Sequence, residues 1–267
     1  MEEIISSRNN PKIKYVRALK MRRGDFPKNV FLVEGIRHVG EAIESGYQVE
    51  TIFYALDLLK SGFALGLIER AEEAGISIVA TTAQVFQTLS ERENPQGVLA
   101  VLRKKEKLLT ELNPRNFSWG VALVSPQDPG NFGTILRTID AVGASGVILL
   151  ECSVDAFHPT AIRAGMGTHF WKPIVQSDIN QFSEWVQQYN YHIYGTSAHA
   201  EKRFESITRY ESPAMLLMGS EKDGLPDKVD VLCEMMVKIP MHGRATSLNL
   251  AVATGILLYD MLVKGIK

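Results

Sequence analysis

The sequence predicts an α/β protein with an open, mostly parallel sheet, because short apolar runs alternate with helix-like segments along most of the chain. The clearest unit covers residues 119–151, where the apolar run WGVALVS is followed by the helix-like NFGTILRTIDAVG and a second apolar run, SGVILLE. Such a succession implies parallel strands joined by a right-handed crossover. Ligands of these sheets bind outside the carboxyl ends of the strands, so the loops that follow the strands are where a site is expected.

The remaining elements follow from the same patterns. In the first half, Asn10 and Pro11 start a helix, a second helix ends near Ser45, and LIERAEEAG forms a third that stops at a glycine. The predicted strands of this half are VFLVEG, VETIFYA, ISIVA and GVLAVL. In the second half, YHIYGTS, AMLLMGS and VKIP are predicted strands, and SLNLAVATGILLYDML has the length of a final helix.

The chain is expected to form two domains. Residues 103–116 are charged and end in a turn-forming Asn-Pro, and they separate two stretches of alternating strand and helix signals. We therefore predict a smaller N-terminal α/β domain over residues 1–105, a linker over residues 106–116 and a second domain over residues 117–267.

The composition is that of an ordinary globular protein, with 45% hydrophobic residues, 22% charged residues and a net charge of −1. Cys152 and Cys233 form no CxxC pair and have no histidine at ligand spacing, so no metal site is expected. Two isolated thiols suit a reducing cytoplasm, and neither a signal peptide nor a membrane span is expected from the polar N-terminus and the short apolar runs.

Positive charge gathers at the N-terminus despite the balanced total. Residues 1–28 carry eight Lys and Arg against three Asp and Glu, a net charge of +5. Such a segment is either the solvated face of a helix or a contact for nucleic-acid phosphates, and composition alone favours the first explanation.

Three loops of the second half follow apolar runs and are rich in glycine, proline and small polar residues: residues 125–137, 218–226 and 239–249. Glycine lets a backbone approach a ligand closely, and free N–H groups at a helix start favour an anion. The loops contain no GxGxxG, Walker or GxSxG pattern, which disfavours nucleotide-phosphate and serine-hydrolase chemistry.

Five polar side chains stand out in these loops. Two glycines flank Asn131 at a predicted helix start, and Arg137 follows six residues later. Glu221 comes directly after an apolar strand, while Ser247 and Asn249 precede the last helix. Taken one at a time, each is also explained as a turn residue, a solvated charge or a helix cap.

Taken together and in order, the three loops resemble the three motifs of the SpoU, or TrmH-like, RNA ribose methyltransferases of the SPOUT superfamily. NFGTILRT, with Asn131 and Arg137, resembles the first motif. MGSEKDGLP, with Glu221, resembles the second, and IPMHGRATSLNLAVATGILLYD, with Ser247 and Asn249, resembles the third. A small departure is Asp260, which stands where the class commonly has glutamate.

The resemblance implies a C-terminal α/β domain with a deep trefoil knot, a homodimer, and S-adenosylmethionine as methyl donor without a metal. The residues it implies for donor binding are Thr196, Gly219, Ile239, Met241 and Leu248. The first half also resembles the ribosomal-protein-like substrate-binding domain often fused to this class, chiefly in NPKIKYVRAL and FLVEGIRHVGEAIESG.

The resemblance nominates Arg137 for removal of the proton from the ribose 2′-hydroxyl. Arginine keeps its own proton, with a pKa above about 12. We therefore expect Arg137 to orient a phosphate and to stabilise negative charge on the 2′-oxygen, while a phosphate oxygen or water accepts the proton. Asn131, Glu221, Ser247 and Asn249 are expected to hold Arg137 and the ribose in position.

With the resemblance, RNA contact becomes the favoured explanation of the basic residues, and we expect it at Arg8, Lys12, Lys14 and Arg37. Ribosomal RNA, 23S in particular, is favoured and transfer RNA is the alternative. Methylation of a base nitrogen, a catalytically silent RNA-binding assembly factor and a generic nucleotide-binding domain remain competing hypotheses.

Overall fold

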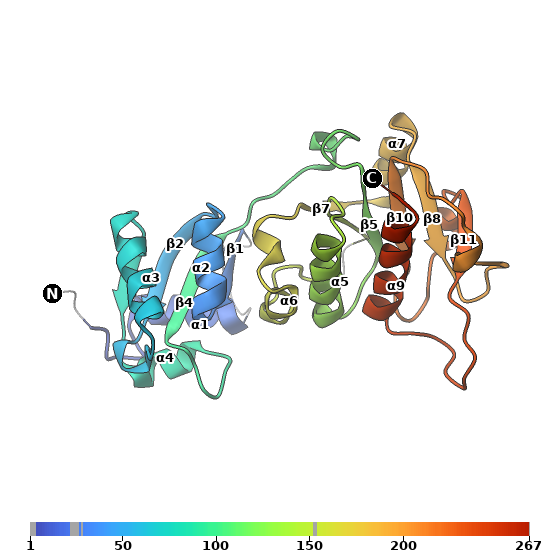
Figure 1. The fold of residues 1–267 in the computed structure, drawn as a ribbon. Coiled ribbons are helices and arrows are strands. Elements are labelled where there is room, and N and C mark those ends of the chain that lie inside the picture. The colour runs from blue at the N-terminus through green and yellow to red at the C-terminus, as the bar shows by residue number, and fades with distance from the viewer. Residues whose placement is uncertain (1–3, 22–26, 28, 152–153, 267) are drawn as a thin grey trace. The chain divides into compact units, whose positions relative to one another are not determined.

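The structure is a computed structural model that describes residues 4–21, 27, 29–151 and 154–266. It divides into two compact units, Met1–Lys105 and Glu106–Lys267. Each unit is an α/β structure built around its own sheet (Figure 1).

Unit 1 contains a four-stranded sheet in the order β1-β4-β2-β3. Its strands are β1 (Val30–Glu34), β2 (Val49–Tyr54), β3 (Ser77–Ala80) and β4 (Val98–Arg103), as predicted. β2 and β3 are parallel, whereas β4 lies antiparallel to both of its neighbours. The last strand therefore returns through the middle of the sheet instead of extending its parallel edge.

Helices cover both faces of this sheet. The helices are α1 (Pro11–Met21), α2 (Ile36–Glu44), α3 (Gly62–Glu73) and α4 (Ala83–Leu89), with a short 3₁₀ turn, η1 (Leu56–Leu58). α1 begins as predicted, with the Asn10 side chain accepting from the N–H of Lys12 at 2.9 Å. The buried face of α1 is Ile13, Val16 and Leu19, which belong to one core cluster with α4. α4 was not predicted, because its seven residues are too few to show a period.

Unit 2 contains a seven-stranded sheet in the order β7-β6-β5-β10-β8-β11-β9, and every pairing within it is parallel. The strands are β5 (Trp119–Val124), β6 (Val147–Leu150), β7 (Ile174–Ser177), β8 (His192–Thr196), β9 (Lys202–Arg203), β10 (Ala214–Met218) and β11 (Met235–Lys238). The expectation of a mostly parallel α/β sheet is confirmed. Because all strands run the same way, their carboxyl ends lie along one edge.

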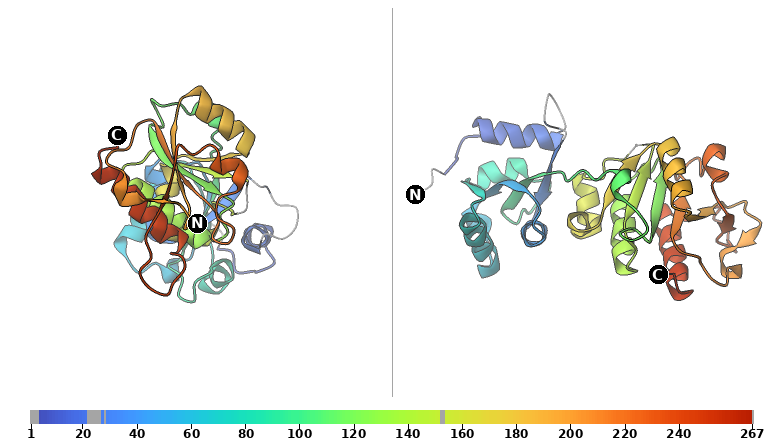
Figure 2. Two further views of the ribbon diagram at one scale, coloured as in Figure 1. Left: turned by 90° about the vertical axis from the view of Figure 1, so that its right-hand side faces the viewer. Right: turned by 90° about the horizontal axis from the view of Figure 1, so that it is seen from above.

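The helices of unit 2 lie on both faces of the sheet (Figure 2). They are α5 (Pro129–Ala141), α6 (Pro159–Gly165), α7 (Ile179–Gln188), α8 (Asp227–Asp230) and α9 (Leu250–Val263), with the 3₁₀ turns η2 (Leu109–Glu111), η3 (Thr168–Phe170) and η4 (Phe204–Ser206). α5, α6 and α9 contribute to one core cluster, and α7, α8 and η2 to the other. No described helix is long and apolar enough to cross a membrane.

The segment 106–116, predicted as a linker, is instead part of unit 2. Leu109 and Leu112 are buried in its core, and the indole N–H of Trp185 donates to the carbonyl of Leu112 at 3.0 Å. The charged residues of this segment led to the prediction of a linker, although Leu109 and Leu112 pack in the core.

α5 and α6 approach each other closely at Gly133. A Cβ atom at Gly133 would lie 2.2 Å from the carbonyl oxygen of Ala161 and 2.8 Å from the side chain of Ala164. Only glycine fits this contact, so the glycine of the first motif fixes how α5 lies against its neighbour.

Candidate functional site

Four neighbouring strands bring the predicted site together. β5, β10, β8 and β11 are adjacent in the sheet, and their carboxyl ends lead into the segments that begin at Ser125, Gly219, Ser197 and Ile239. The three loops singled out in the sequence are therefore neighbours in space, as the parallel-sheet argument requires.

Three of the predicted catalytic residues form one chain of hydrogen bonds. The amide nitrogen of Asn249 donates to the amide oxygen of Asn131 at 2.8 Å, and the amide nitrogen of Asn131 donates to Glu221 Oε1 at 2.9 Å. Each motif supplies one member. The direction of the chain is fixed, because a carboxylate only accepts and therefore the Asn131 amide must turn its nitrogen toward Glu221.

Helix caps and backbone groups hold both ends of this chain. The Asn249 side-chain oxygen accepts from the backbone N–H groups of Ala251 at 2.9 Å and Val252 at 3.3 Å, which caps α9. Glu221 Oε2 accepts from the backbone N–H of Gln127 at 3.3 Å. Asn249 is thus both the cap considered in the sequence and a member of the network.

The start of α5 is anchored in the same manner. Asp128 is its N-cap and accepts from the backbone N–H of Asn131 at 2.6 Å, with Pro129 as the first helical residue. The helix begins two residues earlier than predicted, and its cap Asp128 was not predicted, although an Asp-Pro pair before a helix is a recognisable start signal.

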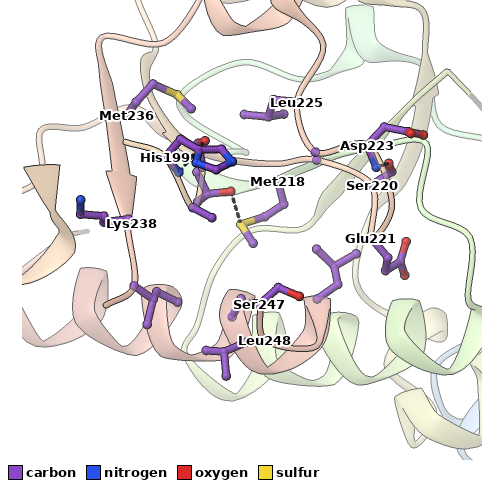
Figure 3. A pocket seen from close by; sticks show the side chains of 18 of the residues that line it. His199, Met218, Ser220, Glu221, Asp223, Leu225, Met236, Lys238, Ser247 and Leu248 are labelled. Atoms are coloured by element: carbon purple, nitrogen blue, oxygen red, sulfur yellow. Dashed lines mark hydrogen bonds between the residues drawn. The ribbon is translucent and has the colours of Figure 1, made fainter. Parts of the chain in front are cut away.

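A cavity of about 570 Å³ lies beside this network. All five residues expected to bind a methyl donor line it: Thr196, Gly219, Ile239, Met241 and Leu248. Glu221 and Ser247 also belong to the lining (Figure 3). Glu221 lies at one end of the view and Lys238 at the other, while Ser247 and Leu248 approach from the loop that leads into α9.

The cavity wall contains further residues that the sequence did not indicate. His199, Leu225, Met236 and Lys238 line the cavity together with the predicted residues. Met236 and Lys238 lie in β11, and His199 and Leu225 lie in the loops that follow β8 and β10. Their positions at the carboxyl ends of predicted strands could have identified them.

Gly219 shapes the cavity through a close backbone contact. Ser220 and Gly224 exchange two backbone hydrogen bonds of 3.1 Å, which folds the loop back on itself. A Cβ atom at Gly219 would lie 2.0 Å from the carbonyl carbon of Gly224. The position therefore admits only glycine, and the loop presents its backbone to the cavity.

Arg137 is not part of the network. It is exposed on α5 and makes no hydrogen bond or ion pair with any residue that the structure describes. Six residues of α-helix turn a side chain about 120° away from Asn131. Asn131, Glu221 and Asn249 hold one another and do not contact Arg137, and Ser247 is exposed. That these residues hold Arg137 and the ribose during the reaction stays a prediction.

Cys233 is a free cysteine that is partly buried in unit 2. Its sulfur approaches Gly195 so closely that a Cβ there would be 2.4 Å away. Burial, with a smaller contribution from Asp230, raises the pKa of Cys233 to about 12. The thiol is therefore protonated near neutral pH and is unsuited to act as a base or nucleophile.

The residues expected to contact RNA all belong to unit 1 and are exposed. Arg8 precedes α1, and Lys12 and Lys14 lie on its first turn. Arg37 is at the start of α2 and pairs with Glu41 at 2.8 Å. No cluster of three metal-binding side chains occurs among the described residues.

Comparison with protein families gives two matches. Residues 118–259 match the SpoU rRNA methylase family, and residues 10–100 match the MRM3-like substrate binding domain. The two matches fall within the two units of the structure.

Curated relatives cover nearly the whole chain. The chain is 31% identical over 258 residues to the 23S rRNA (guanosine(2553)-2′-O)-methyltransferase of Bacillus subtilis, covering 96% of this chain and 98% of the relative. It is also 31% identical over 239 residues to the 23S rRNA (uridine(2479)-2′-O)-methyltransferase of Streptomyces viridochromogenes, covering 86% and 81%.

Solved structures are similar over both units. The AdoMet-bound rRNA methyltransferase of Sinorhizobium meliloti has a TM-score of 0.89 and 31% identity, with 99% of each chain covered. The SpoU methyltransferase AviRb of Streptomyces viridochromogenes, in complex with AdoMet, has a TM-score of 0.85 and 28% identity, with 97% of this chain and 99% of that chain covered.

Proposed function

The chain belongs to the SpoU rRNA methylase family, and we propose that it transfers a methyl group from S-adenosylmethionine to a ribose 2′-hydroxyl of 23S ribosomal RNA. The observation that carries the proposal is the Asn249–Asn131–Glu221 chain of hydrogen bonds beside the cavity. It joins one polar group from each family motif at the edge of the cavity, which supports a role in positioning a donor and a ribose.

The cavity suits S-adenosylmethionine in size and lining. A volume of about 570 Å³ lies within the ordinary range for cofactor sites. Gly219, Ile239 and Leu248 lie in strand-end and loop segments, where backbone N–H and C=O groups are available to an adenine edge. AdoMet is bound in the related structures from Sinorhizobium meliloti and Streptomyces viridochromogenes, which supports this assignment.

The reaction needs alignment more than activation of the donor. The ribose 2′-oxygen forms a bond to the methyl carbon as the carbon–sulfur bond breaks, and the electron pair of that bond returns to sulfur. Asn131 and Asn249 each keep one amide hydrogen outside the network, and these two donors orient the ribose oxygens. The hydroxyl proton leaves to a phosphate oxygen of the RNA or to water.

Arg137 acts in this scheme through charge. It stabilises the developing negative charge on the 2′-oxygen and the phosphate that accepts the proton. Because no described residue pairs with Arg137, its guanidinium is available to RNA.

Unit 1 is proposed to bind the RNA. Its match to the MRM3-like substrate binding domain and the exposure of Arg8, Lys12, Lys14 and Arg37 support this role. Arg37 also pairs with Glu41, so it contributes less free charge than the other three.

We also propose a cytoplasmic homodimer that pairs through α9. Val252, Tyr259 and Val263 are 51%, 50% and 81% exposed on this helix, an apolar stripe that a second copy would cover. The deep trefoil knot of unit 2 stays a prediction from the family resemblance.

The decisive experiment incubates the purified chain with S-adenosylmethionine and unmethylated 23S rRNA transcript, then locates the methyl group by nuclease digestion and mass spectrometry. A 2′-O-methylated nucleotide in 23S rRNA is the expected product. Three other results would contradict the proposal. Methylation of a base would indicate a base methyltransferase, and methylation of transfer RNA alone would indicate a transfer RNA enzyme. Donor binding without turnover would indicate a catalytically silent factor.

A further inference from the structure

Trp171 is an exposed tryptophan at the end of η3 in unit 2. It is 47% exposed, whereas the other two tryptophans of the chain, Trp119 and Trp185, are 3% and 5% exposed. Large aromatic side chains are usually buried, so an indole left in solvent calls for an explanation.

The indole is held in place rather than free to move. Its ring N–H donates to Asp140 Oδ1 on α5 at 3.0 Å. The preceding 3₁₀ turn is fully packed, because Thr168, His169 and Phe170 are 2%, 3% and 5% exposed. A flat aromatic face is thus presented at a fixed angle, which lowers the entropic cost of stacking on it.

Asp140, the hydrogen-bond partner of the indole, has two cationic neighbours. Lys172 Nζ lies 3.4 Å from Asp140 Oδ1 and donates to the carbonyl of Ala144 at 2.8 Å, so the single carboxylate beside the indole is balanced. Arg137 lies one helical turn before Asp140, and side chains at this spacing are neighbours on a helix surface. The guanidinium of Arg137 has no partner among the described residues.

We infer that Trp171 is a stacking platform for a base of the RNA substrate, a few nucleotides along the strand from the methylated ribose. An exposed aromatic ring, with an unpaired guanidinium one helical turn from the residue that holds the ring, suits single-stranded RNA, since bases stack on the ring and phosphates pair with the cation. The inference rests on the proposed function, because it takes the RNA to be the substrate of the Asn131 site.

The geometry sets the distance along the RNA. Nine residues of α5 separate Asn131 from Asp140, a rise of about 14 Å. A stacked strand covers that length in about four nucleotides, and a more extended strand in fewer. The same nine residues turn α5 by about 180°, so the strand must also pass around the helix, and Arg137 lies between Asn131 and Asp140 both along the axis and around it.

The first test measures the fluorescence of Trp171. Since Trp119 and Trp185 are buried, quenching of emission by acrylamide measures the exposure of Trp171. Addition of 23S rRNA transcript to the full-length protein is expected to protect this emission, and a Trp171→Phe variant should lose the quenchable component. Unchanged acrylamide quenching with saturating RNA would overturn the inference.

Matched variants give the second test. Trp171→Ala is expected to weaken binding of the 23S rRNA transcript about 5- to 100-fold, and Trp171→Phe, which keeps an aromatic face, much less. Affinity for S-adenosylmethionine and the unfolding midpoint should stay near wild type in both variants. A Trp171→Ala protein that binds RNA within twofold of wild type refutes the platform, and one that changes subunit number makes Trp171 a contact between copies of the chain.

Failure of the inference is distinguishable from failure of the proposed function. Wild-type protein that methylates 23S rRNA, together with a Trp171→Ala variant of equal RNA affinity, removes only the stacking role. Wild-type protein that binds no S-adenosylmethionine or no 23S rRNA removes both.

Discussion

Reversing the direction of the Asn249–Asn131–Glu221 hydrogen bonds should be tolerated only when both ends are changed together. In the native chain Asn249 donates to Asn131, and Asn131 donates to Glu221. Asn249→Asp removes the first donor and Glu221→Gln removes the acceptor-only group at the far end. With both substitutions, Asn131 can turn over, accept from the glutamine amide and donate to the new carboxylate.

The magnitudes follow from the contacts that each variant loses. Asn249→Asp keeps the oxygen that caps α9 and gains about 0.3–1 kcal/mol from a carboxylate at a helix N-terminus. It also replaces a hydrogen bond worth about 1 kcal/mol by two facing oxygen acceptors, so we expect a net loss of about 1–2 kcal/mol. Glu221→Gln retains its bond to Asn131 but sets an amide against the N–H of Gln127, at a cost of about 0.5–1 kcal/mol.

The double variant restores every bond, so the double-mutant cycle should show a favourable coupling of about 1.5–3 kcal/mol, the sum of the two single losses. Urea unfolding followed by tryptophan emission suits the measurement, since Trp119 and Trp185 are buried in unit 2. If the two free-energy changes simply add within about 0.5 kcal/mol, the network does not couple the motifs and the reasoning fails.

Three further predictions concern the donor pocket, the charge on α5 and the RNA contacts. Gly219→Ala places a Cβ 2.0 Å from the carbonyl carbon of Gly224; donor binding measured by calorimetry should be lost, and near-native affinity would contradict the tight loop. Arg137→Ala should lower turnover by orders of magnitude while leaving donor affinity nearly intact, and near-normal single-turnover rates would refute its role. Lys12→Gln with Lys14→Gln should lower the slope of log affinity against log salt by about 1.4–1.8 if both contact phosphates, and an unchanged slope assigns the two lysines to solvent.

The fold explains why substitution of Lys12 and Lys14 tests RNA binding better than removal of the N-terminal residues. Removing residues 1–28 would delete the basic cluster of the N-terminus. The structure gives α1 a second role, because Ile13, Val16 and Leu19 are 0%, 0% and 7% exposed in the core of unit 1. A truncated protein would lose RNA binding by unfolding as readily as by losing charge.

The strands of the fold were predictable because their patterns are local. Runs such as WGVALVS and AMLLMGS are apolar throughout, as strands covered on both faces must be. α6 and β7 escaped prediction because seven and four residues give too little periodicity. The antiparallel course of β4 depends on its neighbours β1 and β2, which no local pattern encodes.

The site was predictable to the level of residues but not of contacts. Placing Asn131, Glu221 and Asn249 at strand ends predicts that they are close, because parallel strands share an edge. Which of them bond to one another depends on the helix caps at Asp128 and Asn249, which set the angle at which each helix leaves its loop. Arg137 is only six residues from Asn131 in the sequence, which suggested that the two side chains are close. The helix turns them about 120° apart.

The separation of Arg137 from the network bears on the order of events in catalysis. Asn131, Glu221 and Asn249 satisfy one another without RNA, so their positions are set before the substrate arrives. Arg137 has no described partner in the chain, so under the proposed mechanism we expect a phosphate of the RNA to fix its position. The proposed cation would then be in place only when RNA is bound, which would limit reaction of the donor with water. Arg137→Ala should therefore reduce transfer to RNA without increasing hydrolysis of the donor, whereas weakening the Asn131 network should disturb the positions of both substrates.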